Sequence, residues 1–153
     1  MEKIRIKSTL NNFILLDKIT KADQKNICGN KYFSDDPYYL CVEAMAQLGA
    51  YHVRYLTKFD RHAFLLKIDC LNLKQALKEG ISLNGKFNFF ASLTNKSESA
   101  FAYNVCAQKK NIVFGEGKFL FASIDYNDDF NKKPLKDHYR KTFSCLMNDS
   151  QTA

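Results

Sequence analysis

The sequence predicts an α+β domain in which one antiparallel sheet wraps around one long central helix. Residues 37–56, PYYLCVEAMAQLGAYHVRYL, form an apolar run long enough for a helix that crosses a small domain. From residue 64 onward, apolar and polar residues alternate in successive segments joined by short polar turns, which indicates antiparallel hairpins. Because the helix is apolar nearly all round, it needs cover on most sides, and a sheet can provide that cover.

The start of the helix is marked by Asp36, which we expect to act as its N-cap, and by Pro37, which suits the first helical position. A membrane span of this length is possible in principle. Four polar or charged side chains argue against it, since each is expensive in hydrocarbon: Glu43, Gln47, His52 and Arg54.

Glu43 is unusual because it is the only charged residue between Pro37 and Tyr51. A lone carboxylate in such a run needs a partner, a raised pKa or a functional reason. One interpretation is a buried structural glutamate bonded to backbone or water. The other is a general acid that apolar walls keep protonated. The sequence leaves both open.

Short runs on both sides of the helix predict the strands. FILLDKI at 13–19 suits a first strand, residues 24–33 form a second strand or irregular chain, and Ser34, Asp35 and Asp36 turn the chain into the helix. The later strands are predicted by the alternating positions Phe64, Leu66, Ile68 and Cys70; Phe87, Phe89, Ala91 and Leu93; Phe101, Tyr103, Val105 and Ala107; and by the run from Ile112 to Tyr126, with a bulge expected near Gly115 and Gly117.

These segments place the α+β domain in residues 1–126. Residues 127–153 are a polar C-terminal extension, in which KPLKDHYRKTFSCLM at 133–147 suits one helix. The length of 153 residues fits one domain with a core.

The net charge of +7 comes from lysines and arginines that are mostly interleaved with acidic residues. It favours an acidic protein or a phosphate-bearing ligand, and no motif favours nucleic acid. The five cysteines include no closely spaced pair, and Cys41, Cys70 and Cys106 lie in apolar runs that suggest buried thiols. This usage suggests a reducing cytosol, without zinc or a disulfide framework. The N-terminus has no apolar stretch of the kind found in signal peptides, so we expect a cytoplasmic protein.

The helix contains Glu43-Ala44-Met45-Ala46-Gln47, which resembles the EAMAQ signature of the beta-hydroxyacyl dehydratases that act on acyl carrier protein. That family has the hotdog fold. FILLDKI at 13–19 is similar to the family's FLLVDRV strand, and Pro37 matches a proline six residues before the family's glutamate. Lys78-Glu79-Gly80 falls where the family has a Pro-Gly-Asp turn, and FGEGKFLFAS at 114–123 resembles its last strand. The resemblance covers roughly residues 13–126.

The family's HFPG motif has no counterpart in this chain, and its histidine is the catalytic partner of the glutamate. Residues 30–37 read NKYFSDDP and contain no histidine. The resemblance carries the catalytic role to Glu43 alone, with Asp35 or Asp36 as a replacement base. His52 lies roughly 180° around the helix from Glu43, and His62 lies about 28 Å further along it. His138 lies in the C-terminal extension, where a surface position is expected.

The resemblance therefore implies a dehydratase-like protein that acts on or binds beta-hydroxyacyl thioesters of an acyl carrier protein, in fatty-acid or polyketide-type lipid biosynthesis. The alternatives are an acyl-thioester hydrolase and a non-catalytic subunit of a hotdog heterodimer. No cofactor and no metal is expected, since phosphopantetheine carries the substrate. The expected partners are acyl carrier protein or acyl-CoA and a second hotdog subunit, identical or related, but no nucleic acid and no membrane.

Two further groups of residues complete the expected sites. Those expected to bind substrate are Gln47, Tyr38 and Tyr39. The basic residues that are candidates for carrier-protein docking are Arg54, Lys58, Arg61, Lys67, Lys74 and Lys78.

Overall fold

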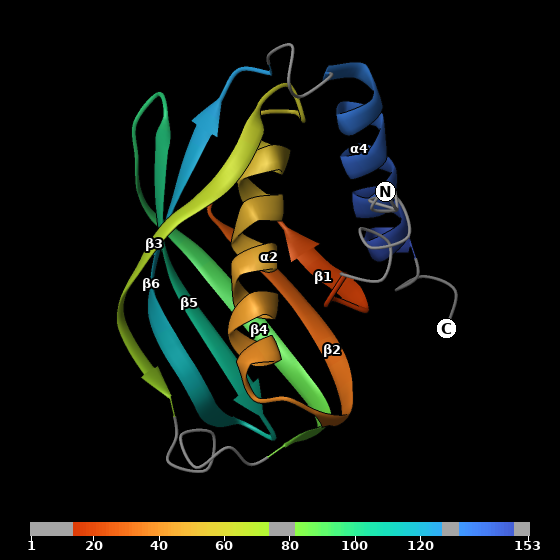
Figure 1. Cartoon of the computed structure of the whole chain (residues 1–153), viewed down its shortest axis with the longest axis vertical. Helices are drawn as coiled ribbons and strands as arrows, with labels where there is room; N and C mark the ends of the chain where they lie inside the picture. Colours follow the sequence, from red (N-terminus) through yellow and green to blue (C-terminus); the bar gives the residue numbers. More distant parts are fainter. Residues whose placement is uncertain (1–13, 74–81, 127–131, 149–153) are drawn as a thin grey trace, which may run out of the picture.

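A six-stranded antiparallel sheet and two helices make up the part of the chain that the computed structural model describes, which is residues 14–73, 82–126 and 132–148 (Figure 1). The strand order across the sheet is β1-β2-β4-β5-β6-β3. In chain order the elements are β1 (Lys18–Ala22), β2 (Asn26–Asp36), α2 (Tyr39–Leu56), β3 (His62–Leu73), β4 (Leu83–Lys96), β5 (Ala100–Lys109), β6 (Ile112–Ile124) and α4 (Lys132–Asn148).

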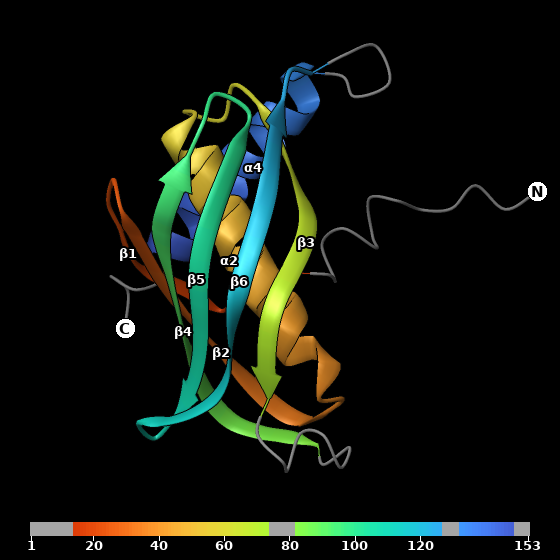
Figure 2. The ribbon, with the colours of Figure 1, turned by 90° about the vertical axis from the view of Figure 1, so that its left-hand side faces the viewer.

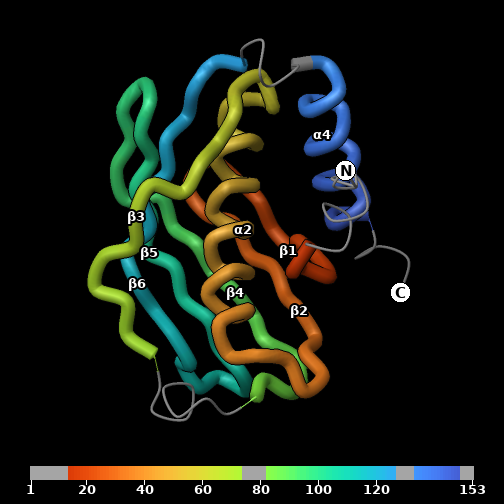
Figure 3. The backbone as a smooth tube through the Cα atoms, in the orientation of Figure 1, coloured from red at the N-terminus to blue at the C-terminus, as the bar shows by residue number. Residues whose placement is uncertain are grey.

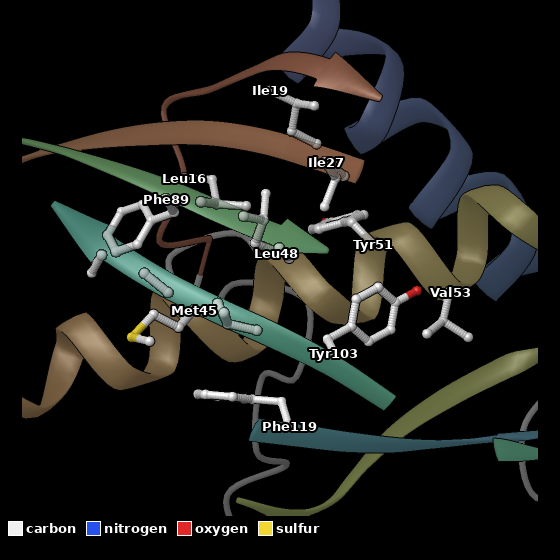
Figure 4. Packing of buried hydrophobic residues seen from close by; sticks show 14 of the residues in the cluster. Leu16, Ile19, Ile27, Met45, Leu48, Tyr51, Val53, Phe89, Tyr103 and Phe119 are labelled. Carbon is white, nitrogen blue, oxygen red and sulfur yellow. The ribbon is translucent and has the colours of Figure 1, made fainter. Parts of the chain in front are cut away.

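The sheet curves around α2, which lies against one of its faces (Figure 2). Alternate residues of the central strands point at the helix, as the period-two pattern predicts. The large inward side chains are almost completely buried: Phe87 and Phe89 on β4, Tyr103 on β5, and Phe119 and Phe121 on β6. Figure 4 shows Met45, Leu48, Tyr51 and Val53 of α2 in one cluster with Phe89, Tyr103 and Phe119 of the sheet. The predicted α+β fold, with a sheet around one helix, is confirmed.

Gly49 allows α2 to approach the sheet closely. A Cβ atom at this position would lie 2.5 Å from Cζ of Phe121. The helix can therefore lie against the ring of Phe121 only because residue 49 has no side chain.

The helix α4 packs beside the C-terminal half of α2 (Figures 1 and 3). The ring of Phe143 lies 5.7 Å from Tyr55, 5.5 Å from Phe59 and 6.3 Å from Tyr51, measured between centroids. Phe143 and Leu146 are buried, and α4 also contacts β1. The C-terminal extension thus forms a helix that shares the core of the domain.

Pro37 lies before the N-cap of α2 and not at the first helical position, because the helix begins at Tyr39. Two further expectations differ from the structure. The first strand begins at Lys18, not at residue 13, because Ile14 to Leu16 run as irregular chain packed on the core. The second concerns Asp36, which does not cap α2: the N-cap residue is Tyr38, with no side-chain hydrogen bond. The Asp36 carboxylate instead accepts the backbone N–H of Ser34 at 2.8 Å, within β2.

Residues 24–33, for which the sequence left a strand or irregular chain open, belong largely to β2. The expected bulge in the last strand is present beside Gly115, where Phe114 is skipped in the pairing of β5 with β6. The Lys78-Glu79-Gly80 turn lies outside the described residues. Neither of the described helices is long and apolar enough to cross a membrane.

Candidate active site on the central helix

Glu43 lies on the open face of α2. It and Tyr39 are the two exposed residues of this helix, while every other position is buried or half-buried. The sequence suggested a carboxylate enclosed by apolar neighbours, but within one chain the sheet covers the opposite side of α2 and leaves Glu43 accessible.

Gln47 lies one turn beyond Glu43, and its side chain holds the segment before β1. Its Oε1 accepts the backbone N–H of Leu15 at 2.8 Å. The amide therefore fixes the chain around Leu16, which is almost completely buried. This contact gives Gln47 a positioning role next to Glu43.

Tyr38 and Tyr39 flank the start of α2 and meet edge to face, with centroids 6.0 Å apart. Tyr39 is 56% exposed, and it lies one turn before Glu43 on the same side of the helix. An exposed aromatic pair beside an exposed carboxylate offers an apolar surface next to an acid–base group.

Asp35 and Asp36, the candidate replacement bases, lie at the end of β2. Asp35 is the extra residue of a β-bulge, with a φ of 54°, and its backbone N–H donates to Oδ1 of Asn84 at 2.9 Å. Aspartate is one of the residues that tolerate left-handed backbone, so it suits this bulge position. Both aspartates end β2, which leads into the start of α2 at one end of the molecule (Figure 1).

His52 has a structural position on the far side of α2 from Glu43, as its spacing predicts. The ring is completely buried between the hydroxyl of Tyr103 and the backbone carbonyl of Asp23, each 2.7 Å from one ring nitrogen. Burial lowers the pKa of His52, while the bond to Asp23 partly opposes this shift.

The other two histidines are also remote from Glu43. His62 begins β3, beyond the C-terminal end of α2, and packs 4.2 Å from the ring of Phe64. Burial lowers the pKa of His62, and the nearby Arg54 lowers it further. His138 lies in α4 beside Tyr139 and is half-buried. No histidine of this chain therefore lies beside Glu43 in the same subunit.

Arg54 is not available for docking, because it is only 8% exposed. Its guanidinium lies 3.9 Å from the ring centroid of Tyr139 and 5.3 Å from that of Tyr51, a cation–π arrangement that joins α4 to α2. The amphipathic pattern could not reveal this contact, since α4 supplies one of the rings.

The remaining basic candidates are dispersed over the molecule. Lys58 and Arg61 follow the C-terminal end of α2, at the opposite end from Glu43, and Arg61 pairs with Asp125 at 2.6 Å. Lys67 on β3 pairs with Asp69 at 3.3 Å. Lys74 and Lys78 lie outside the described residues. The expected docking residues therefore do not form one basic surface around Glu43.

The cysteines are free thiols, with different exposures. Burial raises the pKa of Cys41 to about 12, so this thiol on α2 is unreactive. Cys106 is half-buried. Cys70 is exposed, contrary to the apolar run around it, because it lies in a bulge of β3 with a φ of 53°.

No family model matches this sequence, and no curated protein matches it either. Solved structures do. The dehydratase heterocomplex ApeI:P from Xenorhabdus doucetiae matches with a TM-score of 0.59 and 14% identity, over 77% of this chain and 86% of that chain. A putative thioesterase from Lactococcus lactis matches with a TM-score of 0.64 and 9% identity, over 76% of this chain and 98% of that chain. This chain has the hotdog fold.

A mutant form of a thioesterase from Pseudomonas aeruginosa is similar to the same extent, with a TM-score of 0.59 and 9% identity over 78% of this chain and 88% of that chain. These three similar structures are a dehydratase heterocomplex, a putative thioesterase and a thioesterase. At these identities the likeness establishes the fold, and the chemistry has to be argued from the site.

Proposed function

We propose that this hotdog protein acts on or binds beta-hydroxyacyl thioesters carried on phosphopantetheine, as a dehydratase-like protein with Glu43 as its acid–base group. The observation that carries the proposal is the position of Glu43. It is the exposed carboxylate of an otherwise covered central helix, within the EAMAQ sequence, beside the exposed ring of Tyr39.

Dehydration removes the alpha proton and the beta hydroxyl of the substrate, forms a carbon–carbon double bond and releases water. It needs a base for the proton, an acid for the departing hydroxyl and a donor for the thioester carbonyl. Glu43 can give a proton to the hydroxyl, and the N-terminal end of α2 can polarise the carbonyl. Asp35 or Asp36, at the same end of the molecule, is the candidate base.

Thioester hydrolysis is the second candidate function. It is favoured by the lack of a histidine near Glu43 in this chain, because a single carboxylate that activates water is sufficient for attack on a thioester. The structural similarity to thioesterases adds support from the fold alone.

The third candidate is an accessory subunit that completes its site with a related hotdog chain. Glu43 supplies one half of a glutamate–histidine pair, and a partner with an upstream histidine would supply the other. The match to a dehydratase heterocomplex makes such a pairing reasonable.

The test is hydration of a crotonyl thioester and hydrolysis of the same compound, measured with the purified protein. We expect Glu43→Gln to lower whichever activity is present by roughly 10²–10⁴-fold. Glu98→Gln, at an exposed glutamate in the turn between β4 and β5, is the matched control and should have no effect. Equal activity of Glu43→Gln and wild type would exclude a catalytic role for Glu43.

A further inference from the structure

A basic hollow lies at the end of the sheet where α2 begins, and of its lining only Asn84, the partner of the Asp35 N–H, belongs to the site described above. Its volume is about 470 Å³, within the range of roughly 300–1,000 Å³ that is usual for small-molecule sites. It is lined by Tyr32, Asn84, Gly85, Lys86, Lys109 and Lys110. We refer to this set as the lysine hollow.

The hollow forms because β4 extends beyond the end of β5. The pairing of these strands begins at Asn88 with Gln108, so Gly85 and Lys86 have no partner in β5. Lys109, at the end of β5, and Lys110, in the turn to β6, lie next to this part of β4, which pairs with β2 on its other side. Figure 2 shows the β5–β6 turn and the start of β4 at the same end of the sheet.

Gly85 leaves room for the ammonium group of Lys109. A Cβ at Gly85, whose φ is 92°, would lie 3.1 Å from Cε and 3.4 Å from Nζ of Lys109. The same Nζ lies 5.9 Å from the ring centroid of Phe87. Lys109 is half-buried, and its ammonium group lies between Gly85 and the ring of Phe87.

Lys110 is held in a conformation that is unfavourable for a lysine. Its φ is 50° and that of Asn111 is 64°, as in a hairpin turn that favours asparagine and glycine at both positions. Within the described part of the chain, no carboxylate lies within ion-pair distance of Lys86, Lys109 or Lys110. Three lysines that line one hollow without a salt-bridge partner among the described residues favour an anion with several charges.

Tyr32 supplies an aromatic surface beside these charges. It is directly opposite Lys86 in the pairing of β2 with β4, and its side chain is 64% exposed. An exposed ring next to clustered lysines suits a ligand that combines a planar base with phosphates, since bases stack on aromatic side chains and phosphates bind ammonium groups.

We propose that the lysine hollow binds a phosphorylated nucleoside, with its phosphates on Lys86, Lys109 and Lys110 and its base on Tyr32. Coenzyme A carries such a group at the end remote from its thiol. The link to a thioester substrate rests on the proposed function, whereas nucleotide binding itself does not.

The test is calorimetric titration of the full chain with ADP, adenosine and free coenzyme A. We expect ADP to bind at least about tenfold more tightly than adenosine, because the phosphates make the charged contacts. Lys109→Met should weaken ADP binding by roughly tenfold, and Lys109→Arg should retain most of it. Tyr32→Ala should weaken it by about fivefold or more.

Lys25→Met is the matched control, because it removes the same charge at the opposite end of β2 and should leave ADP binding unchanged. The proposal is overturned if ADP does not bind saturably, or if Lys25→Met and Lys109→Met have equal effects. It is also overturned if the lysines are needed for binding an acyl carrier protein while ADP does not bind.

The two proposals fail in different ways. If ADP binds through Lys109 but no thioester is converted, the nucleotide site stands and the proposed reaction does not. If thioesters are converted and neither ADP nor Lys109→Met affects their KM, the reaction stands and the lysine hollow has no part in it.

Discussion

The hydroxyl of Tyr103 donates a hydrogen bond to Nδ1 of His52 over 2.7 Å, in the middle of the core. The direction follows from the other ring nitrogen. Nε2 lies 2.7 Å from the backbone carbonyl of Asp23, which can only accept, so Nε2 carries the proton and Nδ1 is the acceptor. The arrangement therefore uses a neutral imidazole to join α2 to β5 and to the turn between β1 and β2.

We predict that the protein loses stability as the pH falls below the ordinary histidine pKa of 6.5. Burial lowers the pKa of His52 in the folded state, so the unfolded chain binds more protons in this range and stability rises with pH. Burial also lowers the pKa of His62 in the folded state, so His62 adds to the loss of stability at low pH. The surroundings of His52 are Tyr103, the Tyr55 ring and the Asp23 carbonyl. Backbone hydrogen bonds lower the pKa of the Asp23 carboxyl, so that carboxyl titrates below this window.

Urea unfolding at pH 7 and at pH 5.5 checks this prediction. The free energy of unfolding should be smaller at pH 5.5, and His52→Gln should reduce the difference between the two pH values. A higher stability at the lower pH would contradict the assignment of a neutral, buried His52.

We expect Tyr103→Phe to destabilise the protein by roughly 1–3 kcal/mol, because it leaves Nδ1 of His52 buried without its donor. Tyr32→Phe, which removes the same hydroxyl from an exposed ring, should change the stability very little. Thermal unfolding of the two variants gives the comparison. Equal melting temperatures would show that the Tyr103 hydroxyl contributes nothing.

The sequence alone was sufficient to predict the central helix and the strands that follow it, because their residues repeat with the periods of a helix and of a half-buried strand. Leu48 and Phe89 are examples that the pattern places correctly in the core. The segment before β1 was less predictable: its apolar character resembles a strand, yet Ile14 to Leu16 pack on the core without strand pairing, and the Leu15 N–H bonds to Gln47.

The candidate site was only partly predictable for a similar reason. The EAMAQ resemblance indicated Glu43, but exposure depends on which side of α2 the sheet covers. Arg54 shows the same limit, since its partner Tyr139 is distant in sequence. The lysine hollow depends on the point at which the pairing of β4 with β5 begins, and no local pattern of lysines indicates that register.

We predict that Gly49→Ala destabilises the fold by about 1–3 kcal/mol, the usual cost of overpacking a core. The added methyl would lie 2.5 Å from the ring of Phe121, so α2 or the ring has to move. Ala50→Gly, at the half-buried next position, is the control: it costs helix propensity of about 1 kcal/mol and removes one methyl group that packs on the core. Gly49→Ala at or above wild-type stability would contradict the close contact.

We predict a symmetric dimer formed along β3, the strand at the edge of the sheet next to β6. Leu66 is 57% exposed and is the extra residue of a bulge on this edge, and Leu65 and Leu71 are also exposed. An edge with exposed leucines favours association, and a lysine placed there opposes it. In sedimentation at micromolar concentration, wild type should be dimeric and Leu66→Lys largely monomeric.

Phe90→Lys, at an exposed position of the inner strand β4, is the control for the dimer and should leave its affinity unchanged. A wild-type protein that sediments only as a monomer at this concentration would rule out association through β3.

Finally, we predict that the purified protein alone is a weak dehydratase or an inactive one, and that a related hotdog chain with an upstream histidine restores turnover. Two copies of this chain provide Glu43 twice, while His52 and His62 are both held in packed positions away from it. Loss of a general base typically costs about 10²–10⁴ in rate. If Asp36 serves as the base, the chain would instead work alone.

Hydration of a crotonyl thioester separates these outcomes. If this chain supplies only Glu43 to an active site, wild type alone should have a low rate, and mixing it with the histidine-bearing chain should raise the rate strongly. Mixing that chain with Glu43→Gln should give no increase. A high rate of the purified protein without any partner would exclude the idea that it supplies only half of an active site. Loss of that rate in Asp36→Asn, with the fold intact, would then identify Asp36 as the base, because in the structure its carboxylate accepts the Ser34 N–H within β2.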